Sequence, residues 1–409
     1  MKKLSLLVFS AVLAVFAASC TKENASEIPD EKDSKKEEQP EQPQEHQEPQ
    51  DPLQEFTGIE VEVGEQNGSS KLYILNEGAY PGASTLDLLD FTSKKYYADL
   101  FGQANPSVAQ GLGNTGNDMA LVDGKLWVLL NASNQLAVLE VPSCKLLKVV
   151  EVDAPRYITA SGDYAYVSSY GAAVYGGDPV NGKVYRIHKG SYETSSVEVG
   201  YQPEGLAVLD GKLYVANSGG YNLQHDNRVS VIDLAGFKLE KQLELPATNL
   251  NLLFAACGKL WMNTYGESSW SQDNDGNWVA SVSAPMCLLA FDSAGSSNEI
   301  PNVHAEKMTL CGDYIYAFGN ADEMDGGYDY CLYKVNTTSA AVESTTHFQA
   351  SDLSRVSYAY GLLVNPDNGD IYICDASFTG GSKLHCFNAA LQWKWTVDTG
   401  VGTGHLLLN

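Results

Sequence analysis

Short apolar segments alternate with glycine-containing turns along most of this chain. One phrase recurs seven times, an apolar strand with an aromatic or aliphatic residue at a fixed offset, and six of the copies follow a Gly-Lys or Gly-Asp turn. A repeat of roughly 40–50 residues built from short strands is typical of a β-propeller. The pattern predicts an all-β fold, a seven-bladed β-propeller, with turns at Gly124, Gly162, Gly211, Gly258, Gly312 and Gly369 and a first copy that begins at Lys71.

One repeat shows four strands clearly. They are expected at residues 203–208, 212–216, 228–234 and 239–245, with Asp210-Gly211 as a tight hairpin signal between the first two. A four-stranded sheet of this kind cannot bury both of its faces alone. Each unit must therefore stack against its neighbours around a common axis.

The two ends of the repeat region indicate how the ring closes. No inner strand precedes the first copy at Lys71, and residues 402–409 form an apolar strand with no partner after it. If this C-terminal strand completes the first blade, no long sheet edge is left exposed. We therefore expect residues 67–409 to form one propeller domain whose closing blade contains both ends of the repeat region.

The N-terminus has the features of an export signal. Two lysines precede an apolar run at residues 4–18, which is too short to span a bilayer as a mature anchor. The run ends in Ala17-Ala18-Ser19-Cys20, which resembles a bacterial lipobox. We expect residues 1–19 to be a lipoprotein signal peptide and Cys20 to be lipidated; the alternative is a plain secretory signal.

A polar, acidic segment follows Cys20. Residues 21–56 contain 12 Asp or Glu against four Lys, with repeated Gln and Pro. Such a composition favours a disordered tether, which we assign to residues 20–66. An acidic segment behind a lipidated cysteine resembles the export signal of Bacteroidetes surface lipoproteins. We expect a lipid-anchored outer-membrane protein that faces the extracellular side; the alternative is a periplasm-facing lipoprotein.

The net charge of −25 argues against nucleic acid as a partner. A nucleic acid needs a basic track that replaces its counterions, and the chain has only four arginines. Anionic ligands are disfavoured unless Arg156 or Arg355 lies at the binding site. Contact with the membrane is expected through the lipid anchor only.

Metal and catalytic motifs are not apparent. The seven cysteines after Cys20 lack the spacing of a zinc site or a disulfide scaffold, so we expect them to be small buried hydrophobic residues, with one disulfide left possible. The histidines are scattered, and the acidic run at 273–277 only faintly resembles a calcium loop. We expect no metal, no cofactor and no catalytic residue.

Aromatic and amide side chains gather in the long segments that join second to third strands. These segments are expected on one face of the ring, and exposed rings on long loops usually mark a binding surface. The alternative is that each ring packs beneath its own loop. The predicted ligand-binding residues are Tyr80, Asn131, Arg156, Tyr170, Tyr175, Asn217, Tyr221, His225, Asn263, Tyr265, Trp270, Trp278, Tyr328, Arg355 and Phe378.

Three further phrases of the chain are informative: residues 74–78 (Ile-Leu-Asn-Glu-Gly), 202–208 (Gln-Pro-Glu-Gly-Leu-Ala-Val) and 360–366 (Tyr-Gly-Leu-Leu-Val-Asn-Pro). These phrases resemble the YncE-like propeller lipoproteins of Bacteroidetes. Within that group the chain is similar to the BtuG-type surface proteins. The resemblance implies capture of cobalamin or another corrinoid, as ligand and not as cofactor, and its transfer to an outer-membrane TonB-dependent transporter.

Two other classes of function stay open. A surface propeller of this kind also suits a glycan or a protein partner, since Tyr and Trp stack on sugars and exposed loops contact proteins. A propeller lactonase or lyase would need convergent carboxylates, a His or a metal in the channel. We expect a binding protein and not an enzyme.

Overall fold

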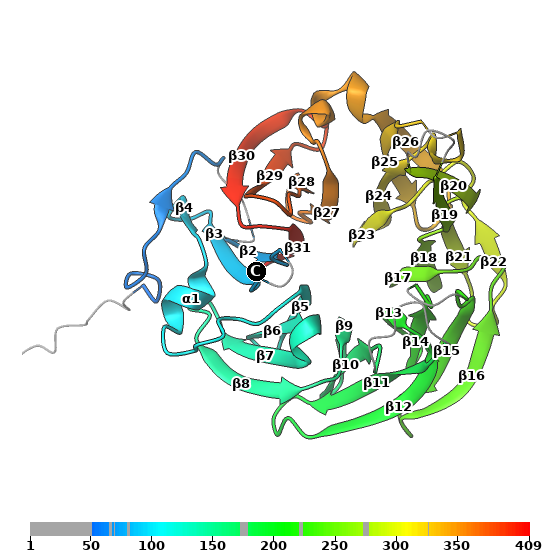
Figure 1. Cartoon of the computed structure of the whole chain (residues 1–409), viewed down its shortest axis with the longest axis horizontal. Helices are drawn as coiled ribbons and strands as arrows, with labels where there is room; N and C mark the ends of the chain where they lie inside the picture. The colour runs from blue at the N-terminus through cyan, green and yellow to red at the C-terminus, as the bar shows by residue number, and fades with distance from the viewer. Residues whose placement is uncertain are drawn as a thin grey trace, which may run out of the picture. The chain divides into compact units, whose positions relative to one another are not determined.

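The protein forms a ring of blades in a computed structural model (Figure 1). The structure describes residues 51–64, 68, 70–79, 82–171, 179–220, 224–272, 278–325 and 327–409. They belong to one compact unit that spans residues 50–409. The ring has seven blades and is almost entirely β, which confirms the predicted fold class.

Six blades follow the order of the chain, each with its innermost strand first. Blade 2 holds β5 (Gly116–Val122), β6 (Lys125–Leu130), β7 (Gln135–Glu140) and β8 (Leu146–Glu151), and blade 3 holds β9 (Pro155–Ser161), β10 (Tyr164–Ser169), β11 (Asn181–His188) and β12 (Thr194–Tyr201). Blade 4 holds β13 (Pro203–Leu209), β14 (Lys212–Asn217), β15 (Arg228–Asp233) and β16 (Lys238–Glu244), and blade 5 holds β17 (Leu250–Ala256), β18 (Lys259–Thr264), β21 (Leu288–Phe291) and β22 (Ser297–Glu299). Blade 6 holds β23 (Lys307–Cys311), β24 (Tyr314–Asn320), β25 (Tyr330–Asn336) and β26 (Val342–His347), and blade 7 holds β27 (Ala359–Val364), β28 (Ile371–Asp375), β29 (Ser382–Phe387) and β30 (Trp393–Thr399).

Blade 1 closes the ring with strands from both ends of the unit. The C-terminal strand β31 (Thr403–Leu408) is its inner strand and pairs with β2 (Lys71–Asn76), with Leu72 opposite Leu408. The sheet continues through β3 (Thr85–Asp90), β4 (Lys95–Tyr97) and β1 (Ile59–Glu60). The predicted closing blade is therefore present.

The compact unit begins before residue 67, the boundary expected from the sequence. Leu53 and Val63 are buried, and β1 adds a fifth strand to blade 1 by pairing with β4. Residues 51–64 therefore pack on the propeller, although their composition resembles that of the acidic tether.

The blades are joined by large apolar side chains from the repeated phrase. Tyr73, Trp127, Tyr214, Trp261 and Tyr372 occupy the equivalent position in five copies, and all are fully buried. Each belongs to an apolar cluster, and these clusters combine residues of adjacent blades. The repeated phrase thus supplies the large side chains that pack one blade on the next.

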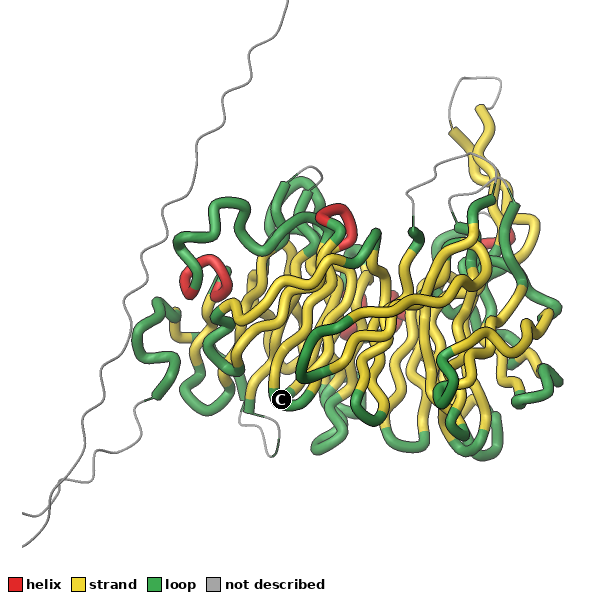
Figure 2. The backbone as a smooth tube through the Cα atoms, turned by 90° about the horizontal axis from the view of Figure 1, so that it is seen from below, coloured by secondary structure: helices red, strands yellow, loops and turns green. Residues whose placement is uncertain are grey.

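The turns between first and second strands are tight and lie on one face of the ring (Figure 2). At Asp123-Gly124, Asp210-Gly211 and Cys257-Gly258 both residues have positive φ, as a type I′ hairpin turn requires. Cys257 lies in such a turn and is exposed, and Cys311 is half-buried, so the prediction that every cysteine is buried is wrong at Cys257 and only partly met at Cys311. The seven described cysteines are free.

The longer connections lie on the opposite face. In blade 5 the connection after β18 contains an extra hairpin of β19 (Glu267–Gln272) and β20 (Trp278–Ala284), which rises above the ring (Figure 2). The remaining helical segments are short: α1 (Leu100–Ala104), η1 (Asn131–Ser133), η2 (Glu323–Asp325), η3 (Phe348–Ala350) and η4 (Asp352–Arg355). Among the described residues, no helix has the length and hydrophobicity that would cross a membrane.

Candidate functional site

The inner strands carry polar residues into the central channel at the face of the long connections. In β5, β9, β13, β17, β27 and β31 the pairing register shifts near the first residues. Such a bulge places an extra residue opposite one residue of the partner strand and redirects its side chain. Two layers of residues line this end of the channel. The layer nearer the long connections includes Asn117, Arg156, Glu204, Glu306 and Tyr360. The layer below it, deeper in the channel, contains Asp118, Tyr157, Gly205, Leu252, Lys307, Gly361 and His405. We call these residues, together with Glu77, the channel mouth.

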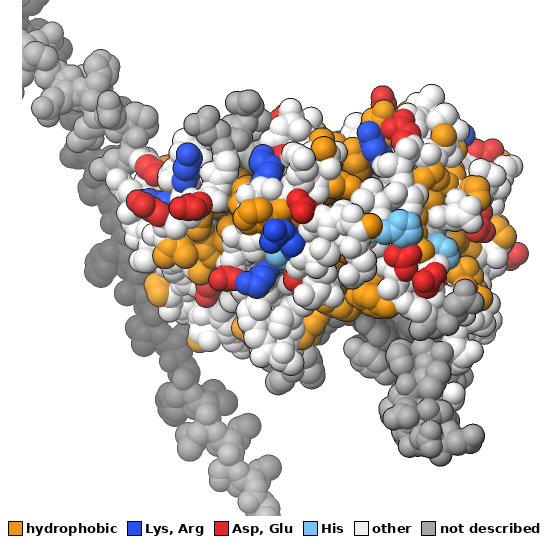
Figure 3. Space-filling model, turned by 90° about the horizontal axis from the view of Figure 1, so that it is seen from above, with side chains coloured by type: hydrophobic (Ala, Val, Ile, Leu, Met, Phe, Trp, Pro, Cys, Tyr) orange, Lys and Arg blue, Asp and Glu red, His pale blue; other side chains and the backbone are white. Residues whose placement is uncertain are grey.

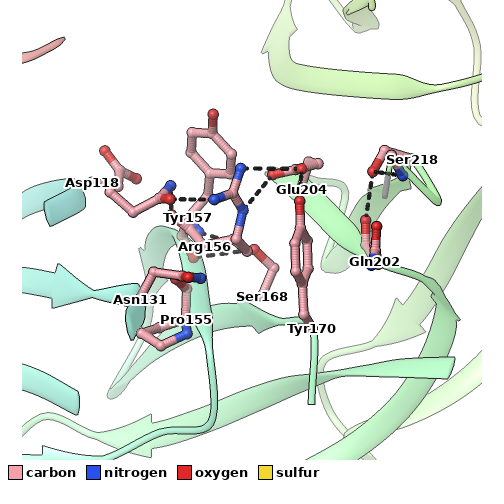
Figure 4. A network of polar contacts seen from close by, with 12 residues as sticks. Asp118, Asn131, Pro155, Arg156, Tyr157, Ser168, Tyr170, Gln202, Glu204 and Ser218 are labelled. Carbon is pink, nitrogen blue, oxygen red and sulfur yellow. Dashed lines mark hydrogen bonds and ion pairs between the residues drawn. The ribbon is translucent and has the colours of Figure 1, made fainter. Parts of the chain in front are cut away.

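Arg156 is the centre of one half of the channel mouth (Figure 4). Its Nε donates to Glu204 Oε2 at 2.9 Å, its Nη2 to Glu204 Oε1 at 3.2 Å, and its Nη1 to the Asn117 side chain. The Tyr170 hydroxyl donates to the same carboxylate, and the guanidinium lies 4.7 Å from the centre of the Tyr170 ring. Burial alone would lower the pKa of Arg156, but Glu204 together with the surrounding tyrosines Tyr170, Tyr157 and Tyr265 raises the pKa above its ordinary value. In this half of the channel mouth, the Arg156 cation is therefore paired with Glu204 and held in place.

The other half of the channel mouth is organised by Glu77, which follows β2. Its Oε1 accepts from the Tyr360 hydroxyl at 2.8 Å and lies 3.4 Å from His405 Nε2. Burial would raise the pKa of Glu77, yet the hydrogen bonds from His405 and Tyr360 lower it below its ordinary value. Glu77 is therefore held as a carboxylate between the Tyr360 hydroxyl and the His405 ring.

Lys307 lies between these two halves. Its Nζ is 5.2 Å from the centre of the Tyr360 ring. Among the described residues, this ammonium group has no hydrogen-bond partner and no ion-pair partner. Burial lowers the pKa of Lys307, whereas it raises the pKa of Glu306, which accepts from the Tyr330 hydroxyl at 2.5 Å. A desolvated cation with free donors is a group that a hydrogen-bonding ligand can satisfy.

Replacing Glu77 with Gln should cost about 1.5–3 kcal/mol of stability at pH 7 and less at pH 4. A carboxylate with a lowered pKa stabilises the folded state above its ordinary pKa of 4.5, and this contribution is lost as the pH falls through the folded value. Urea unfolding of both proteins at pH 7, 5 and 4 measures the difference. The control is Glu343→Gln, in an exposed pair with Lys334, and a difference at Glu77 that does not change with pH would contradict the assignment.

Aromatic side chains of blades 6 and 7 extend from the channel mouth onto the surrounding face. Tyr358 stacks on Tyr360 with ring centres 6.0 Å apart, and Phe378 meets the Tyr360 ring edge-on at 5.4 Å. Tyr328 packs on Tyr330 at 4.8 Å and places its hydroxyl 3.4 Å from the Ser357 carbonyl. Tyr328, Tyr358 and Phe378 are 61%, 45% and 38% exposed. We call Tyr328, Tyr330, Tyr358, Tyr360 and Phe378 the aromatic strip.

The cavities at this end of the ring are small. The central one has about 260 Å³, one beside Arg156 and Tyr265 about 360 Å³, and one beside Lys307 and Tyr360 about 250 Å³. Pockets that enclose a drug-sized ligand occupy roughly 300–1,000 Å³, so these cavities lie below or near the lower end of that range. A larger ligand would therefore lie across the face and insert only a substituent into the channel mouth.

The structure brings several predicted site residues together here. Arg156, Tyr170, His225 and Tyr265 line one cavity, in which His225 Nδ1 lies 3.7 Å from Glu267 Oε1. Tyr328 and Phe378 belong to the aromatic strip. These residues come from blades 3 to 7, so the face combines parts of the chain that are far apart in sequence.

Other predicted residues lie elsewhere. Asn217 and Asn263 are buried within the blades: Asn217 accepts from the Gly200 amide, and Asn263 donates to the Ala305 and Glu306 carbonyls. Asn131 donates to the Pro155 carbonyl, and Arg355 lies over the exposed Trp393 ring. Trp270 and Trp278 are on β19 and β20, but their side chains, like Cys20, Tyr80, Tyr175 and Tyr221 as a whole, lie outside the described residues.

Sequence reasoning missed most of the channel mouth. Glu77, Glu204, Glu306, Lys307, Tyr360 and His405 were not among the predicted site residues, although Glu77, Glu204 and Tyr360 lie within the phrases that carry the family resemblance. The sequence did contain a signal for the channel mouth. In several repeats, charged residues interrupt an otherwise small and apolar inner strand at the same place. Their significance depends on the bulges, which the sequence pattern does not show.

The site and the fold together define a propeller with a buried, charged channel mouth and an exposed aromatic strip. No protein-family model and no curated protein matches the chain. Among solved structures, Kuenenia stuttgartiensis hydrazine synthase has a TM-score of 0.53 at 13% identity, over 71% of this chain and 88% of that chain. Apo AztD from Citrobacter koseri has a TM-score of 0.49 at 10% identity, over 84% and 98%. At such identities the likeness to hydrazine synthase shows the fold alone.

Proposed function

We propose that this propeller is a lipid-anchored surface protein that binds a corrinoid such as cobalamin and passes it to an outer-membrane TonB-dependent transporter. The lipobox at Cys20, the acidic segment behind it and the resemblance to BtuG-type propellers support the location and the class of ligand. The protein would act by binding and release, without chemistry on the ligand.

The observation that carries the proposal is the adjacency of the aromatic strip and the channel mouth. A corrinoid is a broad ring system with amide side chains around its edge. The exposed rings of Tyr328, Tyr358 and Phe378 offer a surface for its apolar face, since amphipathic aromatic side chains contribute large contact area. One amide arm would reach Lys307, whose Nζ has donors to spare.

A glycan is the second candidate, and a specific feature favours it. Tyr358 and Tyr360 stack with their planes only 19° apart, which leaves a flat aromatic surface beside hydrogen-bonding groups. Sugars present an apolar ring face and hydroxyl groups to surfaces of this kind. The two candidates differ in size and in their visible absorption, so they are separable by direct measurement.

Calorimetry with cyanocobalamin tests the proposal. We expect saturable binding, and the double variant Tyr358→Ala/Phe378→Ala should weaken it by at least about tenfold, since a truncated anchor residue costs roughly 1–3 kcal/mol. Trp393→Ala is the matched control because Trp393 is 41% exposed but packs on Arg355 and not in the aromatic strip. The control should bind like the unmodified protein.

Two results would overturn this assignment. No heat and no spectral change at micromolar cobalamin, together with binding to an oligosaccharide array, would favour the glycan. Equal cobalamin affinity in the double variant and the Trp393→Ala control would place the ligand away from the aromatic strip.

A further inference from the structure

Three side chains of different ligand types converge on the side of blade 6 that faces blade 5. Cys331 on β25 and His347 on β26 are direct cross-strand partners, and Asp329 lies two residues before Cys331. Alternation along a strand therefore places all three on one face of the sheet. Their ligand atoms lie within 4.8 Å of one another.

One imidazole nitrogen faces both other groups. His347 Nδ1 lies 3.4 Å from Cys331 Sγ and 2.8 Å and 3.0 Å from the two oxygens of Asp329. A neutral imidazole nitrogen either donates one hydrogen or accepts one, so it cannot satisfy a thiol and a carboxylate equally. A cation shared by the thiolate, the imidazole and the carboxylate would satisfy all three.

We propose that Asp329, Cys331 and His347 bind a zinc-class divalent cation. Cys, His and Asp are ligands that zinc accepts, with bonds of about 2.0–2.3 Å. In a tetrahedral arrangement such bonds place neighbouring ligand atoms roughly 3.3–3.8 Å apart, a spacing that the sulfur and nitrogen already have. The thiolate and the carboxylate together neutralise the two charges of the ion.

The exposure of the three groups leaves room for entry of the ion. Cys331 is fully buried in the apolar cluster between blades 5 and 6, whereas the side chains of His347 and Asp329 are 54% and 28% exposed. Figure 3 shows histidine and acidic side chains next to one another on this outer side of the ring. The fourth position would face solvent and take a water molecule.

Binding would involve loss of the thiol proton. Zinc binds the thiolate form of cysteine, so the Cys331 thiol must lose its proton when the ion binds. On binding, the S–H bond breaks, a sulfur–metal bond forms and the proton passes to solvent. Affinity should therefore rise with pH.

The site has a structural consequence for the face described above. The Asp329 amide donates to Asn320 Oδ1 at 2.8 Å and its carbonyl accepts from the Ala321 amide, which closes the base of the connection between β24 and β25. Tyr328 is the preceding residue. A bound ion would tie this connection to β26 and so fix the outer end of the aromatic strip. The inference does not depend on which ligand the strip binds.

Titration of the full, metal-free chain with Zn²⁺ against a chromophoric chelator tests the site. We expect one saturable site that is weakened at least about tenfold in Cys331→Ser and in His347→Gln, a loss that even outer-shell partners of metal ligands produce. Co²⁺ should give a sulfur-to-metal charge-transfer band that Cys331→Ser abolishes and His347→Gln shifts. Cys257→Ser, at the exposed cysteine, and His188→Gln are controls that should bind like the unmodified protein.

Each outcome decides for or against the site. Because Cys331 is buried, its variant can unfold, and the exposed His347→Gln variant then decides alone. Failure of the chain to bind Zn²⁺, or unchanged affinity in His347→Gln, would leave only a His–Asp ion pair beside a thiol and overturn the proposal.

Discussion

A chain that lacks residues 402–409 should lose at least about 5 kcal/mol of stability, a large part of the 5–15 kcal/mol typical of a folded domain. Strand β31 is the inner strand of blade 1, and its removal would expose the buried edge of β2. It would also remove Thr403, which is fully buried against the Asn76 side chain. Apolar clusters of blades 1 and 7 would open to water, so the effect should reach beyond one blade.

Thermal unfolding followed by circular dichroism measures this effect. We expect the truncated chain to unfold at a much lower temperature and over a broader range. A synthetic peptide of residues 402–409 should restore the transition in a concentration-dependent way, and a scrambled peptide of the same composition should not. An unchanged transition in the truncated chain would show that β31 does not hold the ring closed.

The blade architecture was predictable because one physical requirement is repeated seven times. Each copy needs a turn residue that tolerates positive φ and a large side chain to pack on the next blade, as at Gly124 and Trp127. The closing strand was also predictable, since the first copy lacked an inner strand and residues 402–409 formed a strand without a partner. By contrast, the extra β19–β20 hairpin lies in what the pattern showed only as a long connection.

The candidate site was less accessible to sequence reasoning. Loop aromatics such as Tyr328 and Phe378 could be found because exposed rings on long connections are unusual. The amides at Asn217 and Asn263 looked equivalent to them, but the structure buries both and uses them to hold backbone groups. The pair of Arg156 and Glu204 is separated by 48 residues, and only the stacking of two blades brings the charges together.

Cross-strand pairing also explains why the Asp329, Cys331 and His347 cluster was missed. Metal motifs are recognised by short spacings along the chain, whereas His347 follows Cys331 by 16 residues and reaches it through the register of β25 and β26. The strand pairing therefore determines whether the three groups meet. The absence of a spacing motif does not exclude such a site in a protein made of hairpins.

Replacing Arg156 with Met should destabilise the protein by about 3–5 kcal/mol, the second large effect that we expect. The side chains of Arg156 and Glu204 are only 13% and 1% exposed, so removal of the cation leaves a buried carboxylate without its partner. The hydroxyl of Tyr170 would still donate to Glu204, but one neutral donor does not replace a bidentate cation. Arg156→Lys should also be destabilising, because an ammonium group lacks the planar fork that meets both oxygens.

A double-mutant cycle separates the pair from the loss of packing. Glu204→Gln removes the charge but keeps an acceptor for Tyr170. The double variant Arg156→Met/Glu204→Gln should therefore be more stable, by roughly 2 kcal/mol, than the sum of the two single losses predicts.

The surface pair Lys383 and Asp398 is the control. Its atoms are 2.7 Å apart, but its side chains are 52% and 85% exposed. Lys383→Met should therefore cost less than about 1 kcal/mol. Urea unfolding gives all of these free energies. Equal losses for Arg156→Met and Lys383→Met would mean that the buried pair does not hold blades 3 and 4 together. The claim that Glu204 holds the Arg156 cation in place at the channel mouth would then be wrong.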